Sequence, residues 1–258
     1  GGWRYDYVKG FGPWVAKDFR QYTNWSYGIG EYWDSNTGTL NWWTGAADCS
    51  AFDFASYYTL NGICDNTGGG GYLPDLVNNN KSFAARNGNR AVTFLENHDT
   101  HEITNHKHIG YAYAMTFKGY PCLYWKDYFD YNLDDMGGQW GNGIKQLTWV
   151  REKLAGGGPN VEYLKTNDGD CLIYADKDGG SSNPGYIEVI NDNANNWRGS
   201  WVRTSNGNLK NKTLKCYAWY STKSGQNYQP ANKYCNGSGD VEVWAPPRGY
   251  AVYAPTGY

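Results

Sequence analysis

The clearest pattern along the chain is a short apolar run that turns abruptly polar. Residues 91–95 read Ala-Val-Thr-Phe-Leu, the composition of a strand buried on both faces. Glu96, Asn97, His98 and Asp99 follow directly. In α/β barrels the carboxyl ends of the strands carry the functional side chains. The pattern therefore predicts a buried parallel strand whose end supplies a site.

Two runs earlier in the chain have the same form. Residues 2–7 alternate and carry Arg4 and Asp6, and residues 25–31 end at Glu31. Together with the first run they supply three carboxylates and a guanidinium at strand ends. Glycoside hydrolysis uses one carboxylate as nucleophile and a second carboxyl as proton donor. Each group also has a simpler interpretation: an aspartate can cap a helix or a turn, and a glutamate can lie exposed in a loop.

The intervening residues predict the helices and strands that would connect such a sheet. Pro at a first helical turn marks one helix start, and Gly119 marks a helix end. Residues 33–49, rich in Asn, Thr, Gly and Trp, predict a loop, as do residues 68–71. The expected helices are Pro13–Tyr22, 54–61, Tyr72–Asn79, Ile109–Lys118 and Gly143–Lys153, and the further strands are 50–54 and 121–125.

After a Gly-rich linker at residues 156–159 the pattern changes to short alternating runs separated by turn residues. This predicts an antiparallel β domain with sandwich topology. It has no recurring carboxylate set, so we assign it a packing role, with carbohydrate contact possible at Trp201, Trp219 or Tyr220. The runs are 171–174, 186–190, 199–203, 213–220, 241–244 and 250–253.

Four segments resemble motifs of one enzyme family. GWRYDYVKG at residues 2–10 resembles the strand-four motif of the α-amylase family of (β/α)8-barrel glycoside hydrolases. GEYWD at 30–34 resembles the strand-five motif and FLENHDT at 94–100 the strand-seven motif. GYPCLYWKDYFD at 119–130 resembles the strand-eight region of plant-type and maltooligosaccharide-forming amylases. Four motifs in the family's order make a strong signal, which covers roughly residues 1–155.

The resemblance implies an α/β fold with a partial (β/α)8 TIM barrel. Residues 1–155 would hold strands four to eight, and residues 160–258 would form the C-terminal antiparallel β-sandwich domain. A complete barrel needs about 250 residues. We therefore expect the chain to be the C-terminal part of a larger enzyme. Its expected partner, besides the glucan substrate, is the missing N-terminal part of that enzyme.

The resemblance also implies a role for each site residue. Asp6 matches the catalytic nucleophile, Glu31 the general acid/base and Asp99 the third catalytic carboxylate. Arg4, on the same strand face as Asp6, would keep that carboxylate ionised. His98 would hydrogen-bond the same sugar.

Two neighbouring residues match further family positions. Lys9 matches a substrate-binding residue, and the carbonyl of Gly10 matches a ligand of a structural calcium ion. The rest of that calcium shell would lie in the missing segment. His101, Glu102 and Ile103 differ from the chloride-dependent animal enzymes, which argues against a chloride site.

The function implied is retaining endo-hydrolysis of α-1,4-glucosidic bonds in starch- or glycogen-type glucans, through a covalent glycosyl-enzyme. The alternative is a catalytically inert amylase fragment that serves as a structural or glucan-binding protein. Composition agrees with a carbohydrate ligand: aromatic residues reach 17%, whereas the formal net charge of −2 gives no nucleic-acid footprint. No run is long and apolar enough to suggest a membrane span.

The cysteines and glycosylation sequons favour an extracellular, secreted glycoprotein with disulfides. Six cysteines match no zinc-binding spacing, and we expect the pairs Cys49–Cys64 and Cys216–Cys235, with Cys122 a free core thiol. The four Asn-X-Ser/Thr sequons begin at residues 24, 80, 211 and 236.

Overall fold

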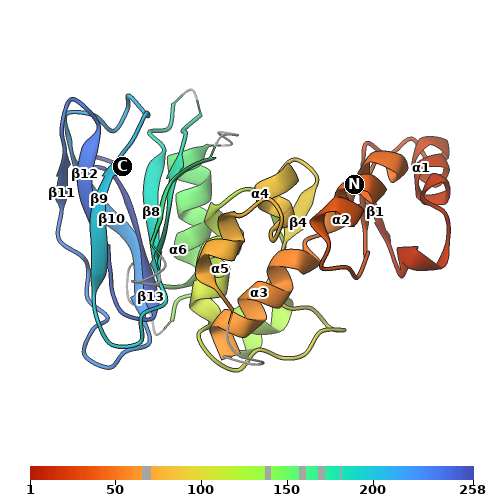
Figure 1. Ribbon diagram of the computed structural model, residues 1–258, viewed down its shortest axis with the longest axis horizontal. Helices are drawn as coiled ribbons and strands as arrows, with labels where there is room; N and C mark the ends of the chain where they lie inside the picture. Colours follow the sequence, from red (N-terminus) through yellow and green to blue (C-terminus); the bar gives the residue numbers. More distant parts are fainter. Residues whose placement is uncertain (66–70, 137–140, 157–160, 168–171, 181) are drawn as a thin grey trace. The chain divides into compact units, whose positions relative to one another are not determined.

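The computed structural model describes the chain as two compact units (Figure 1). The predicted loop at 68–71 and linker at 156–159 fall largely outside the described residues, as does Cys171. The first unit comprises Gly1–Ile103 and Lys118–Cys122, and the second comprises Thr104–Phe117 and Leu123–Tyr258. The described residues are 1–65, 71–136, 141–156, 161–167, 172–180 and 182–258.

The first unit is built on a five-stranded sheet in which every strand is parallel to its neighbours and the spatial order follows the sequence. Parallel order brings all carboxyl ends of the strands to one edge. The strands are those predicted, but shorter. They are β1 (Gly2–Tyr5), β2 (Tyr27–Gly30), β3 (Ser50–Phe52), β4 (Ala91–Thr93) and β5 (Tyr120–Pro121).

Helices connect these strands, as parallel pairing requires. α1 begins at Pro13 and ends at Tyr22, as predicted from the proline. The expected helix at residues 72–79 is a 3-10 helix, η3 (Leu73–Val77). The remaining helical segments of this unit are η1 (Val8–Gly10), α2 (Thr37–Ala47), α3 (Phe54–Asp65) and α4 (Phe83–Asn87).

The loop predicted at residues 33–49 is wrong, because most of it is helix α2. The side chain of Asn36 accepts a hydrogen bond from the Thr39 amide at 3.0 Å and so caps the helix. Leu40, Trp43 and Ala47, at helical spacing, are fully buried. Burial of this stripe outweighs the weak helix propensity of the Thr, Gly and Trp residues.

The packing of α2 against the sheet depends on a glycine in β2. A Cβ atom at Gly30 would lie 2.1 Å from Cη2 of the Trp43 indole, so any side chain there would collide with the ring. Trp43 belongs to a cluster with Leu40 and Ala51 that fills the helix side of the sheet. Gly30 is also the residue before Glu31, so this contact fixes the strand end that bears a site carboxylate.

The second unit contains a six-stranded sheet, order β11-β10-β13-β8-β7-β6, and a two-stranded ribbon, β12-β9. Every pairing in both is antiparallel. β6 and β11 lie outside the predicted runs. The strands are β6 (Val161–Asn167), β7 (Leu172–Lys177), β8 (Tyr186–Asn191), β9 (Arg198–Arg203), β10 (Lys212–Ser221), β11 (Lys233–Cys235), β12 (Asp240–Ala245) and β13 (Gly249–Pro255).

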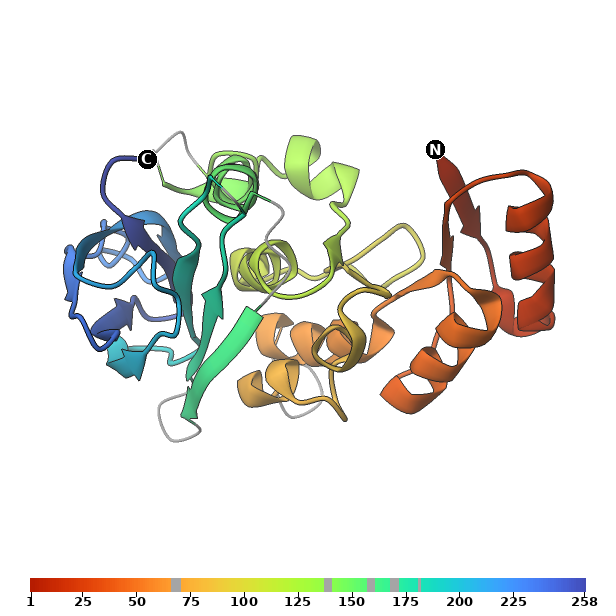
Figure 2. The same ribbon diagram turned by 90° about the horizontal axis from the view of Figure 1, so that it is seen from above.

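Both faces of the six-stranded sheet are covered, which explains why β7, β8 and β13 are buried along their whole length. Helices α5 (Lys107–Thr116) and α6 (Gly143–Trp149) contact one face, beside β8, β10 and β13 (Figures 1 and 2). Two π-helical segments, η4 (Lys126–Asp130) and η5 (Val150–Ala155), complete the helical part of this unit. The β12-β9 ribbon covers the other face.

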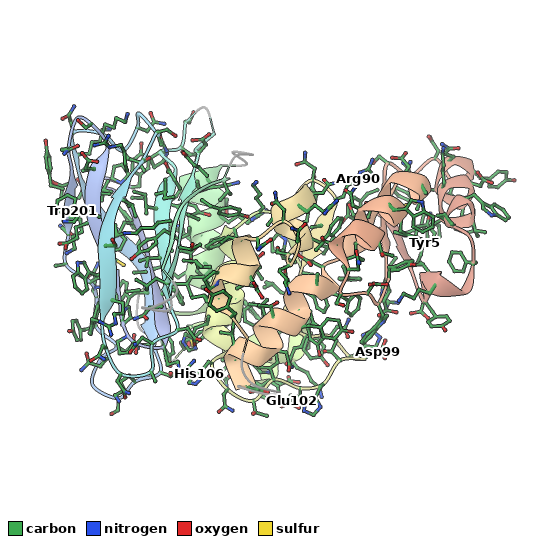
Figure 3. All side chains as sticks on the ribbon, in the orientation of Figure 1. Tyr5, Arg90, Asp99, Glu102, His106 and Trp201 are labelled. Atoms are coloured by element: carbon green, nitrogen blue, oxygen red, sulfur yellow. The ribbon has the colours of Figure 1, made fainter. Side chains whose placement is uncertain are left out.

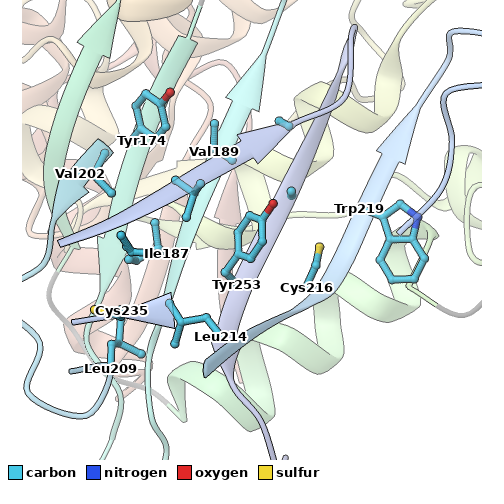
Figure 4. Close-up of a cluster of buried hydrophobic side chains, with 14 of the residues drawn as sticks. Tyr174, Ile187, Val189, Val202, Leu209, Leu214, Cys216, Trp219, Cys235 and Tyr253 are labelled. Carbon is cyan, nitrogen blue, oxygen red and sulfur yellow. The ribbon is translucent and has the colours of Figure 1, made fainter. Parts of the chain in front are cut away.

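The core between the sheet and the ribbon is one apolar cluster (Figure 4). Ile187 and Val189 of β8 meet Val202 of β9 and Val243 of β12 in this cluster. Trp219 of β10 also belongs to it and is 3% exposed. Trp219 therefore cannot offer its ring to a sugar, and its predicted carbohydrate contact is wrong.

The predicted disulfides are wrong, because Cys49, Cys216 and Cys235 carry free thiols. Cys235 pairs with Lys212 of β10, and Cys216 lies four residues further along that strand, about 13 Å at the rise of a strand. A disulfide needs Cα atoms within about 7 Å. The Cys49 sulfur faces Gly28 of β2 rather than Cys64. Cys122 is a free thiol, as predicted.

Candidate active site

The ends of β1 and β2 place two carboxylates side by side. Tyr5 pairs with Gly30, and the Glu31 amide donates to the Tyr5 carbonyl at 2.9 Å. Asp6 and Glu31 are the next residues of each strand, so both emerge at the same edge. This register follows directly from parallel pairing.

The third carboxylate comes from the loop after β4. Asp99 reaches the same place: the nearest carboxylate oxygens of Asp6, Glu31 and Asp99 all lie within 4.8 Å of one another. Asp99 and Glu102, both on this loop, are labelled in Figure 3. The predicted convergence of the three carboxylates is therefore confirmed. Their catalytic roles stay predictions.

Arg4 bridges two of these carboxylates. Its Nη1 atom lies 2.7 Å from Oδ1 of Asp6 and its Nη2 atom 2.8 Å from Oε1 of Glu31. A guanidinium presents such donors in a fixed plane, which makes it suited to hold two oxygens apart. One cation thus sets the position of both groups.

The two bridged carboxyls differ in environment. The Asp6 side chain is 72% exposed, whereas that of Glu31 is 4% exposed. The hydrogen bond from Arg4 lowers the pKa of Asp6, and the Arg4 charge and a hydrogen bond with Glu31 act in the same direction. Asp6 is therefore held ionised, as a nucleophile requires, while Glu31 sits shielded from water.

The β4 loop is held by its own hydrogen bonds. The Asn97 side chain accepts from the Asp99 amide at 2.9 Å, and Thr100 Oγ1 accepts from the Asn97 amide at 2.9 Å. Buried Glu96 accepts from the Ile103 amide at 2.7 Å and so closes the loop at its base. Sequence reasoning gave Glu96 no role, although it lies inside the FLENHDT motif. His98 Nε2 lies 3.0 Å from Asp99 Oδ2, beside the carboxylates.

Lys9 lies at the rim and is tied to the β2 loop. Its Nζ atom lies 3.1 Å from Oδ2 of Asp34 and 5.0 Å from the centre of the Tyr32 ring. Asp34 and Tyr32 both belong to the GEYWD motif, and sequence reasoning gave neither a role in holding Lys9. Substrate binding by Lys9 stays a prediction.

Calcium binding at Gly10 stays a prediction. Calcium takes six to eight oxygen ligands. Among the described residues, the one cluster of three acidic, His or Cys side chains at metal-binding distance is Asp6, Glu31 and Asp99, where Arg4 already supplies a positive charge. The Gly10 carbonyl supplies one oxygen ligand, so the predicted calcium site needs several further ligands.

Parallel strands thus deliver three carboxylates and an arginine to one edge, an arrangement with the paired carboxyls that glycoside hydrolases use. No family profile matches the chain. It is 30% identical over 162 residues to "Alpha-amylase 3, chloroplastic" of Arabidopsis thaliana, a match over 52% of this chain and 18% of that protein. It is 29% identical over 185 residues to the "Glucan 1,4-alpha-maltotetraohydrolase" of Stutzerimonas stutzeri, over 58% of this chain and 30% of that protein.

Solved structures agree in fold. The chain matches an Anoxybacillus α-amylase with a TM-score of 0.65 at 16% identity, over 100% of this chain and 59% of that one. It matches the acarbose-bound α-amylase of Geobacillus thermoleovorans with a TM-score of 0.66 at 14% identity, over 98% and 59%. The resemblance to the α-amylase family is therefore confirmed: the homologues are α-amylase-type glycoside hydrolases. The chain spans less than two thirds of the length of each.

The described helices include none that is long and apolar enough to cross a membrane.

Proposed function

We propose that this chain takes part in the retaining endo-hydrolysis of α-1,4-glucosidic bonds in starch- or glycogen-type glucans. The observation that carries the proposal is the convergence of Asp6, Glu31 and Asp99 around one arginine. A retaining enzyme needs its nucleophile and acid close together, with carboxyl groups about 5 Å apart. The acarbose complex of a structural neighbour supports an α-glucan ligand for the fold.

In the proposed mechanism Asp6 attacks the anomeric carbon while Glu31 gives its proton to the departing glycosidic oxygen. The bond to that oxygen breaks as the Asp6 ester forms. Water then attacks the same carbon, Glu31 takes its proton, and Asp6 is released as a carboxylate. Asp99 and His98 would hold sugar hydroxyls in place during both steps.

The finer interpretation of the fold is also part of the proposal. We take the five parallel strands as strands four to eight of a (β/α)8 barrel and the antiparallel sheets as the sandwich domain of such enzymes. The proposed domain limits are residues 1–155 and 160–258, and the proposed partner is the remainder of the barrel. Calcium binding at Gly10 would need ligands from that partner. An extracellular location is proposed on the sequons alone, since the disulfides are absent among the described cysteines.

The test is reducing-sugar release from soluble starch by single variants. We expect Asp6→Asn, Glu31→Gln and Asp99→Asn each to lower kcat at least about a hundredfold. Asp18→Asn, which removes an exposed carboxylate on α1, is the matched control and should leave the rate unchanged. The stereochemistry of the first product, read by NMR, should be retained.

The alternative is an inert fragment that serves as a glucan-binding or structural protein. The exposed residues of β1 favour this reading, since three of its four residues are exposed. Starch binding with no sugar release, from this chain and from the full-length gene product alike, would establish the alternative and remove the proposed mechanism.

A further inference from the structure

The outer face of the β12-β9 ribbon carries two tryptophans at neighbouring positions. Trp201 of β9 lies opposite Glu242 of β12, and Trp244 lies opposite Gly199. Val202 and Val243 point into the core, so the alternation of a strand turns Trp201 and Trp244 to the outer face. Trp201 is 61% exposed and lies on the surface of this unit (Figure 3).

A glycine makes room for the second indole. A Cβ atom at Gly199 would lie 2.5 Å from the Trp244 ring, so this ring occupies the space above the glycine. Trp244 and Trp201 are diagonal cross-strand neighbours, a relation that separates backbones by about 7–8 Å. Trp201 is exposed and Trp244 is half-buried, so this face offers aromatic surface at two neighbouring positions.

The groups beside the indoles indicate the chemistry of the ligand. Arg203 is held by Asp240 through two contacts, at 2.6 and 3.0 Å, so this pair is neutral. Glu242 remains as a carboxylate beside Trp201 with no ion pair within the described part of the chain. An uncompensated carboxylate repels nucleic acid and anionic lipid, and it accepts hydrogen bonds from hydroxyl groups.

Charged residues also flank the two tryptophans on this face. Trp201 and Trp244 alternate with charged residues, whereas the core of a protein–protein interface is depleted of charge. Aromatic faces flanked by a hydrogen-bond acceptor suit a neutral ligand with apolar C–H faces and hydroxyl edges. Those are the features of a glycan chain.

We propose that the Trp201–Trp244 surface is a second, non-catalytic binding site for a neutral glycan. The identification of this glycan as an α-glucan rests on the proposed function of the first unit. The site would hold a polymer through stacking and through Glu242, independently of hydrolysis.

The test is retardation of the 258-residue chain in native gels that contain amylose. Trp201→Ala and Trp244→Ala should each weaken binding about five- to tenfold, and the double variant should migrate as in a gel without glucan. Tyr234→Ala is the matched control, since Tyr234 is 60% exposed on β11 of the same unit. Equal retardation of the wild type and the double variant would overturn the proposal.

Two further measurements separate the outcomes. If the tryptophan variants change the sedimentation of the chain and not its retardation, the surface is a protein–protein interface and the glycan site is excluded. Asp6→Asn should abolish sugar release and keep retardation. Retardation that depends on Trp201, with no sugar release by the wild-type chain or by the full-length gene product, would leave the surface standing and refute the proposed hydrolysis.

Discussion

At the scale of single residues, Arg4 organises the site more than any carboxylate does. It forms ion pairs with both Asp6 and Glu31, and it lies on the short strand that ends just before Asp6. The spacing of two residues along a strand is what turns both side chains to one face. The sequence motif contains this relation, which is why the pairing could be predicted.

We expect Arg4→Gln to raise the pKa of Asp6, because the hydrogen bond and the charge that lower it are both removed. The acid limb of the rate profile should therefore move to higher pH. A carbon-detected NMR titration of the Asp6 carboxyl measures the shift even in an inactive protein. Arg86→Gln, which alters an exposed arginine of α4, should leave the titration unchanged.

His108 on α5 makes the stability of the second unit pH-dependent. Its Nε2 lies 2.9 Å from the Arg248 carbonyl, and burial lowers its pKa from 6.5 to about 3. Below pH 6.5 the imidazole of His108 binds a proton in the unfolded chain, whereas in the folded chain it stays neutral down to about pH 3. Stability from this residue is thus lost as pH falls, by up to about 1.4 kcal/mol per pH unit.

The measurement is denaturant unfolding of the wild type and His108→Gln between pH 7 and pH 4. The glutamine keeps a donor but has no proton to gain. The wild type should lose its advantage over the variant as pH falls. Parallel stability curves would show that His108 does not titrate as a buried neutral ring.

At the scale of elements, the contact between α2 and β2 sets where Glu31 emerges. We expect Gly30→Ala to destabilise the first unit by about 1–3 kcal/mol, because its Cβ collides with the Trp43 indole. Glu31 should also move, so activity should fall more than stability alone explains. Thermal unfolding and starch hydrolysis measure the two effects.

A second substitution checks the cause. Combining Gly30→Ala with Trp43→Leu should restore part of the lost stability, because the smaller leucine side chain leaves room for the new Cβ atom. If the double variant is less stable than the sum of the two single variants predicts, the collision is not the reason.

The sequence predicted the elements that bear the site better than those that support it. The strand ends that bear Asp6, Glu31 and Asp99 could be predicted, because at each of them an apolar run is followed directly by polar residues. Helix α2 could not be predicted from the sequence, because it is stabilised by the tertiary burial of Trp43 rather than by local helix propensity.

The predicted disulfides were wrong for a related reason. Separation along the sequence says nothing about register, and the β10–β11 register puts Cys216 far from Cys235. The short strand β11 and the outward direction of Trp244 could not be predicted either, because both depend on cross-strand partners that no local pattern reveals.

At the scale of the whole molecule, the first unit has an edge strand with an open side. Among the described strands β1 pairs only with β2, and Trp3 within it and Tyr7 just after it are exposed. Parallel sheets are usually covered, and open edges recruit further strands.

We therefore expect the 258-residue chain on its own to associate at high concentration. Sedimentation velocity over a concentration series should show oligomers. Trp3→Lys should shift the distribution toward the monomer, because a charge on an edge strand opposes pairing. Trp42→Lys, at an exposed tryptophan of α2, is the control. A wild-type chain that stays monomeric throughout would contradict this expectation.

The bridging arginine has one more consequence for the proposed reaction. While Asp6 is free, the charge of Arg4 is shared between two neighbours. Once Asp6 becomes an ester it is neutral, and the whole positive charge faces Glu31 at 2.8 Å. In the proposed reaction, this is the step in which water must be activated beside Glu31. The guanidinium would then act on the two carboxyls in turn, so that a single strand residue couples the first half of the proposed reaction to the second.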